Sequence, residues 1–91
     1  MYKLIVLPVV DRVFKKLAKK DKEQLLAVNK KILQLQENPF IGKPLHFPLQ
    51  NKRRVHVFKS FVLVYDIQEA EKTITIRDYD HHDNIFKKPI N

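Results

Sequence analysis

Cysteine is absent from this 91-residue sequence, and glycine occurs only once. Without cysteine, the chain can form neither disulfides nor thiolate metal sites. Small secreted domains usually depend on such cross-links, so we expect a cytoplasmic protein. No apolar run approaches the roughly 18 residues of a membrane-spanning helix. The apolar stretch Leu4–Val10 is also too short for a secretory signal, and we interpret it as a strand with no membrane partner.

Acidic residues are scarce relative to basic ones. The sequence has 18 Lys and Arg against 10 Asp and Glu, which gives a net charge of +8. The positive electrostatic potential of such a chain attracts polyanions, namely nucleic acid, an anionic membrane or an acidic protein. The charge is also uneven, because residues 43–59 contain no acidic residue. Their basic residues are Lys43, Lys52, Arg53, Arg54 and Lys59. This clustering favours a polyanionic partner over a plain lysine-rich surface.

A chain of this length forms one domain, so residues 1–91 are treated as a single domain. Two helices are predicted in its first half. Pro8 begins the first, in which apolar residues recur at helical spacing over about three turns. Asp21 and Gln24 form a capping box for the second helix, which ends before Pro39. The two together make a helical hairpin.

Alternating and β-branched segments predict a sheet around this hairpin. Strands are expected at residues 2–7, 54–58, 61–67 and 73–79, with a short strand or extended piece at 43–49. The order β-α-α-β-β-β-β predicts an α+β fold. In that fold, the two-helix hairpin packs on one face of a mostly antiparallel, four- to five-stranded sheet.

Alternation also predicts which side chains face the helices. Val55 and Val57 are expected to face the helices, which leaves Arg54 and His56 on an open, concave face. The expected core joins strand residues to helix residues, namely Val55, Val57, Leu63 and Ile76 to Val13, Phe14, Leu25 and Ile32.

Four histidines point to acid–base chemistry. Histidine suits this role because its unperturbed pKa lies near neutrality. Cleaving RNA without a metal needs a base for the 2′-hydroxyl, an acid for the leaving 5′-oxygen and cations for the phosphate. His56 and His82 could supply the acid and the base. Arg54, with Lys52 and Arg53 beside it, could supply the cations.

Each of these residues also has a structural interpretation. His56 could be a half-exposed sheet residue without a role, and residues 52–54 could form a solvated turn. His81, His82 and Asp83 could bind a metal, but adjacent strand residues point to opposite faces and chelate poorly together. We therefore expect no metal.

Two segments resemble the RelE/ParE toxin superfamily of type II toxin–antitoxin systems. They are Arg54–Tyr65, with the sequence RVHVFKSFVLVY, and Asp80–Phe86, with the sequence DHHDNIF. The nearest resemblance is to the RelE/YafQ-like branch of mRNA interferases. The predicted element order and helix lengths fit the same superfamily over nearly the whole chain.

The resemblance implies a toxin that inhibits translation by cutting mRNA on the ribosome, without metal or any other cofactor. The cut would use the 2′-hydroxyl and leave a 2′,3′-cyclic phosphate. The implied partners are the ribosome, mRNA and a cognate antitoxin. We expect the antitoxin's binding segment to be acidic and partly helical, because the toxin is basic and one sheet face is predicted to be open.

The resemblance also implies which residues form the site, by matching positions of this sequence to the family patterns. His82 matches the C-terminal catalytic histidine of the YafQ pattern, and Phe86 matches its aromatic partner. His56 matches the histidine of the third strand, Arg54 a lysine of the RelE branch, and His46 a further histidine upstream. The residues expected to bind RNA are Lys43, Lys52, Arg53, Lys59 and Arg77.

The sequence departs from the family patterns at three positions. Ser60 and Phe61 stand where the YafQ pattern has aspartate and tryptophan, and Val62 stands where the RelE branch has arginine. Two alternatives therefore remain. One is a ParE-like inhibitor of DNA gyrase, which needs no acid–base pair. The other is a non-catalytic member of the fold that binds RNA or antitoxin.

Overall fold

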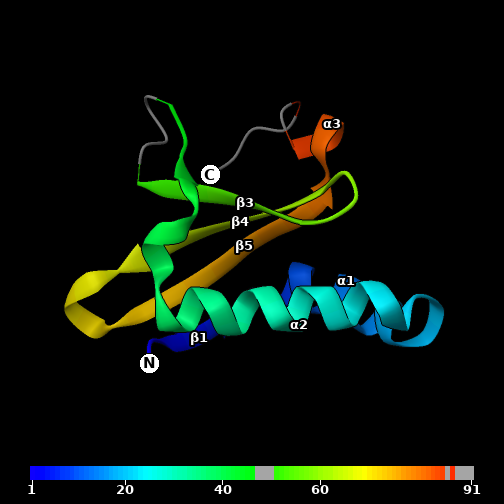
Figure 1. The fold of residues 1–91 in the computed structure, drawn as a ribbon, viewed down its shortest axis with the longest axis horizontal. Helices are drawn as coiled ribbons and strands as arrows, with labels where there is room; N and C mark the ends of the chain where they lie inside the picture. Colours follow the sequence, from blue (N-terminus) through cyan, green and yellow to red (C-terminus); the bar gives the residue numbers. More distant parts are fainter. Residues whose placement is uncertain (47–50, 86, 88–91) are drawn as a thin grey trace.

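Two long helices and a five-stranded sheet form most of residues 1–46, 51–85 and 87, which the computed structural model describes (Figure 1). The elements in chain order are β1 (Lys3–Val6), α1 (Pro8–Lys20), α2 (Lys22–Glu37), η1 (Pro39–Ile41), β2 (Lys43–Pro44), β3 (Lys52–Phe58), β4 (Phe61–Gln68), η2 (Glu69–Glu71), β5 (Thr73–His81) and α3 (His82–Ile85).

The sheet has the strand order β1-β5-β4-β3-β2. β1 pairs with β5 in parallel, and the other neighbours are antiparallel. Helices α1 and α2 lie along one side of this sheet (Figure 1). The predicted α+β fold and its element order are therefore confirmed. Within the described ranges, no helix has both the length and the apolar character needed to cross a membrane.

Asp21 joins the two helices. Its backbone N–H donates to Leu17 O at 2.8 Å and closes α1, while its carboxylate accepts from Gln24 N–H at 3.1 Å and opens α2. The Gln24 side-chain amide donates to the Asp21 carboxylate at 3.0 Å. In a standard capping box, the side-chain oxygen instead accepts from the N-cap backbone N–H. The Gln24 oxygen accepts from the Tyr79 hydroxyl at 2.6 Å, which ties α2 to β5.

The main core lies between the helices and the sheet. Its buried residues are Val10, Val28, Ile32, Leu35, Leu63, Tyr65, Ile74, Ile76 and Tyr79. Val55 and Val57 pack against this cluster, as do Val13 and Phe14. The predicted orientation of β3 is therefore confirmed. Leu25 is half-buried outside the cluster that was expected to include it.

The opposite sheet face is less open than alternation alone predicts. Leu45, Val62, Val64 and Ile85 form a second buried cluster there. Ile85 comes from α3 and Leu45 from the segment after β2, so these two short pieces cover part of the face. The expectation of a wholly open face was wrong, because β4 is buried on both sides over residues 62–66.

A close backbone approach fixes the segment between α2 and β3. The Tyr65 hydroxyl donates to Pro39 O at 2.5 Å and accepts from Gly42 N–H at 3.0 Å. Arg53 Nη1 donates to Gly42 O at 2.7 Å, and its guanidinium lies 5.2 Å from the centre of the Phe40 ring. These contacts hold η1 and β2 against β3.

Candidate active site

His56 and Arg54 lie on the sheet face that points away from the helices. In the register of the sheet, His56 is opposite Val62 and Arg54 is opposite Val64, and both valines belong to the second cluster. His56 is exposed and Arg54 is half-buried. Alternation along β3 therefore carries a titratable and a cationic side chain to the same face.

His82 joins them from the end of β5. It is the first residue of α3, and its backbone N–H donates to Ser60 O in the β3–β4 turn at 2.7 Å. The His56 and His82 rings are nearly parallel, with an interplanar angle of 17° and centroids 6.1 Å apart. Two histidines from distant parts of the sequence thus face one another across a short gap.

His81 has different surroundings. Its ring lies edge-on to Phe61 at 5.7 Å, and Phe61 stacks on Tyr79 of the main core. Asp83 N–H donates to His81 Nδ1 at 3.2 Å, and the exposed Asp83 carboxylate lies 3.5 Å from His82 Nδ1. Among residues 1–46, 51–85 and 87, no group of three or more His, Cys, Asp or Glu side chains could hold a metal ion.

A β-bulge in β5 decides which side chains reach the site. β5 carries one extra residue, Arg77, opposite β4. Beyond it the alternation that starts at Ile76 is reversed, so Tyr79 turns into the main core and Asp80 lies on the face of His56. Bulges commonly stand beside active sites, where they redirect a side chain in this way.

Asp80 is a site residue that the sequence analysis missed. It is opposite Val62, and its carboxylate accepts from His81 N–H at 2.7 Å and from Asn84 Nδ2 at 3.1 Å. Regular alternation from Ile76 places it on the helix side, and only the bulge brings it to this face. The face that carries His56 therefore also carries a carboxylate, although the family's acidic position holds Ser60.

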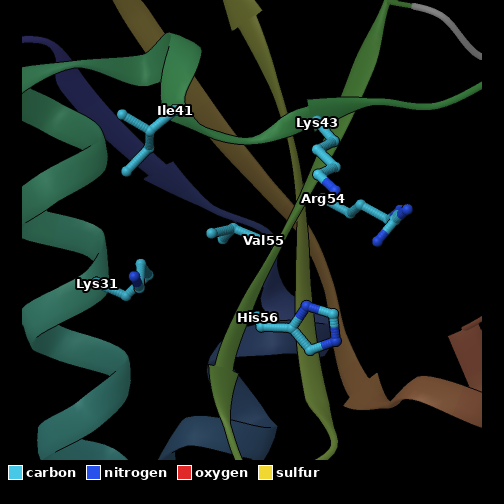
Figure 2. Close-up of a pocket in the computed structure, with 6 residues that line it drawn as sticks. All are labelled: Lys31, Ile41, Lys43, Arg54, Val55 and His56. Atoms are coloured by element: carbon cyan, nitrogen blue, oxygen red, sulfur yellow. The ribbon is translucent and has the colours of Figure 1, made fainter.

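The outer edge of β3 borders a pocket of about 310 Å³ next to His56 (Figure 2). It is lined by Lys31, Ile41, Lys43, Arg54, Val55 and His56. In Figure 2, Val55 points toward α2, whereas Arg54 and His56 project from the other side of β3. Lys31 had no signal in the sequence, because it stands in α2 far from the motifs, beside the buried Ile32.

Three of the expected RNA-binding residues make contacts within the fold. Lys52 is only 7% exposed, which leaves little of it accessible to a phosphate. It is opposite the buried Asp66, which forms an ion pair with Arg77. Arg53 is engaged with Gly42 and Phe40 as described above. Residues 52–54 are therefore the start of β3, not the solvated turn that was the alternative.

The other expected residues are spread around the site. Lys43 is exposed and lines the pocket, and Lys59 is exposed in the β3–β4 turn, with its ammonium 5.3 Å from the Phe58 ring centre. His46 is exposed and directly precedes residues 47–50. Phe86 lies outside the described residues, so its expected role as the aromatic partner of His82 stays a prediction.

Comparison with known proteins assigns the chain to a family. Residues 5–86 match the family model described as "ParE toxin of type II toxin-antitoxin system, parDE". A Methanocaldococcus jannaschii protein named "Putative toxin RelE4" is 46% identical over 88 residues, which are 97% of this chain and 94% of that protein. The chain belongs to the RelE/ParE toxin superfamily.

Solved structures of toxins agree with this assignment. The toxin in the Mycobacterium tuberculosis toxin–antitoxin complex RelBE2 has a TM-score of 0.74 and 26% identity, over 88% of this chain and 96% of that chain. The isolated Escherichia coli RelE toxin shares the fold, with a TM-score of 0.69 and 19% identity over 96% and 97% of the two chains. The protein is thus a type II toxin of the RelE/ParE superfamily.

Proposed function

We propose that this RelE/ParE toxin is a metal-independent endoribonuclease that cuts mRNA on the ribosome. The observation that carries the proposal is the approach of the His56 and His82 rings, 6.1 Å apart and nearly parallel. A proton-transfer group must lie within about 3 Å of the oxygen it serves. Two oxygens of one phosphodiester therefore need two such groups a few ångströms apart, which matches this spacing.

The proposed reaction needs only the RNA and these side chains. One histidine removes the proton of the 2′-hydroxyl, whose oxygen attacks the adjacent phosphorus. The bond from phosphorus to the 5′-oxygen breaks, and the other histidine donates a proton to that oxygen. The products are a 2′,3′-cyclic phosphate and a free 5′-hydroxyl. Arg54 stands two residues before His56 on the same face of β3, and in this proposal it stabilises the charge on the phosphate oxygens.

The rigid supports of both histidines favour this chemistry. His56 is held in a strand that is paired with β4, and His82 is held by its backbone hydrogen bond to Ser60. Catalytic groups on ordered elements keep the geometry that proton transfer requires. Val62 stands where the RelE branch has an arginine, so Arg54 is the cation on this face that we assign to the phosphate. We therefore propose that this toxin cleaves RNA more slowly than a toxin that has both cations.

Inhibition of DNA gyrase is the second candidate function. The observation that favours it is the match of residues 5–86 to a family model named after ParE. Such an inhibitor has no need for two facing histidines, so we rank it below RNA cleavage. A non-catalytic binding role would fit the changes at Ser60 and Val62, but it too leaves the histidine pair unexplained.

The relatives also bear on the partners. The RelBE2 relative was solved as a toxin–antitoxin complex, which implies a cognate antitoxin for this toxin. We propose that the antitoxin's binding segment is acidic and partly helical, in keeping with the toxin's net charge of +8. Because ribosomes are the proposed target, we expect the toxin to act in the cytoplasm and to need no cofactor.

One experiment separates the three functions. The purified toxin is added to a reconstituted translation reaction, and the ends of the message fragments are identified. Gyrase supercoiling is measured in parallel. We expect fragments that end in a 2′,3′-cyclic phosphate and unchanged supercoiling. Lost supercoiling with intact message would support the gyrase inhibitor instead, and no effect in either assay would support a binding module.

A further inference from the structure

The pocket beside His56, which we call the edge pocket, forms where the sheet is incomplete. β2 is opposite β3 only at Arg53 and Arg54. The outer edge of β3 next to these residues faces α2 and η1, and the pocket of about 310 Å³ lies there (Figure 2). His56 lines this pocket, and its ring also faces the ring of His82.

The lining of the edge pocket is suited to an anion. Lys31 comes from α2, Lys43 from β2 and Arg54 from β3, and none of its six lining residues is acidic. Cations brought together from three elements repel one another, and a bound anion relieves that repulsion. Ile41, which is 44% exposed, and Val55 supply an apolar wall beside them.

We propose that the edge pocket binds the phosphate next to the cleaved one in mRNA, and that Lys31 is the residue that contacts it. This inference rests on the proposed RNA cleavage. His56 belongs to both the histidine pair and the lining of the edge pocket. A strand whose cleaved phosphate lies between the rings would pass around the outer edge of β3 to bring its next linkage to Lys31. The apolar wall then lies against the attached sugar or base.

The size of the pocket favours RNA over an acidic peptide. A volume of about 310 Å³ is at the small end of ligand pockets and suits one nucleotide unit. An amphipathic helix of an antitoxin binds in an extended groove through side chains spaced over several turns. Lysine also binds phosphate well as a point charge, which does not require the planar geometry that arginine recognition uses.

The test compares Lys31→Gln with Lys30→Gln. Lys30 is the next residue along α2, is exposed and does not line the pocket, so its substitution removes the same charge elsewhere. The probe is a ribosome-bound message with a 2′-deoxynucleotide at the cleavage position, which binds but cannot be cut. Lys31→Gln should weaken binding about ten-fold. It should also reduce the slope of log affinity against log salt by about 0.7.

A second probe locates the contact. Neutral methylphosphonate linkages are placed in turn on either side of the cleavage position. One of them should weaken binding of the wild-type toxin and have no further effect on Lys31→Gln, because the contact is already lost. Lys31→Arg, which keeps the charge, should bind as the wild type does. Equal loss from each neutral linkage in both proteins, or equal effects of Lys31→Gln and Lys30→Gln, would overturn the proposal.

These readouts are independent of cleavage. If the wild type cuts normal message but Lys31→Gln binds the uncleavable message normally, the pocket inference fails alone. If the wild type cuts no message, the proposed function fails, and the binding data still decide what the pocket holds. Weaker antitoxin binding by Lys31→Gln, with message binding unchanged, would assign the pocket to a protein ligand and overturn the RNA proposal.

Discussion

At the scale of single residues, neighbouring histidines offer a matched comparison. His82 faces His56, whereas His81 contacts Phe61 on the side of the main core. Loss of a positioned proton-transfer group typically costs roughly 10²–10⁴-fold in rate. We therefore predict that His82→Ala loses growth inhibition and slows message cleavage by about that factor, while His81→Ala changes the rate far less.

Three controls separate a loss of chemistry from a loss of folding or of binding. Circular dichroism and antitoxin binding should be the same for wild type, His82→Ala and His81→Ala, and cleavage should be compared at equal ribosome occupancy. Equal cutting by His82→Ala and the wild type would remove His82 from the chemistry.

The only glycine gives a second residue-scale prediction. A Cβ on Gly42 would lie 2.4 Å from the Tyr65 hydroxyl oxygen and 2.9 Å from Arg54 O. Gly42→Ala should therefore destabilise the fold by about 1–3 kcal/mol, measured by urea unfolding. Tyr65→Phe removes the nearer obstacle, so the two substitutions together should cost less than the sum of their separate effects. Additive costs would show that the crowding at Tyr65 is unimportant.

At the scale of elements, Asp21 couples stability to pH. Hydrogen bonds from Gln24, first from its backbone and then from its side chain, lower the pKa of Asp21 in the folded protein. The charged cap therefore stabilises the fold above the unfolded pKa of aspartate, and this contribution is lost as the pH falls through the lower folded pKa.

We predict that Asp21→Ala is less stable than wild type at neutral pH and that this difference shrinks in acid. Asp21→Asn, which keeps a good N-cap without a titrating carboxyl, should lack this part of the pH dependence. Thermal unfolding across the acid range measures both variants. A difference between wild type and Asp21→Ala that stays constant down to low pH would contradict the assigned role of the carboxylate.

The elements also show how far sequence reasoning reached. The helices and β3 were predictable, because each buries one face and its apolar residues repeat with the matching period. The position of His56 on the sheet face away from the helices followed from the alternation along β3. The bulge at Arg77 was not predictable, and it moved Asp80 to the site. The burial of Lys52 and the position of Lys31 beside β3 depend on tertiary packing, which no local pattern records.

At the scale of the whole molecule, net charge governs association. Because the toxin has a net charge of +8 and the proposed antitoxin segment is acidic, opposite charges should contribute to binding and be screened by added salt. We predict that antitoxin affinity, measured by calorimetry, falls steadily from low to high salt. Affinity that is unchanged over this range would indicate an interface formed mainly by apolar contacts, such as the exposed Leu26 and Leu33 of α2.

The central claim is that His56 and His82 divide the acid and base roles when the toxin acts on a ribosome-bound message. The most direct test is single-turnover cleavage of a message in which sulfur replaces the bridging 5′-oxygen at the cut site. A thiolate leaves without being protonated, so loss of the general acid no longer matters while loss of the general base still does. We predict that one of His56→Ala and His82→Ala recovers nearly the wild-type rate on this message and the other stays slow. Failure of both variants to recover, at full ribosome occupancy, would contradict the paired acid–base mechanism.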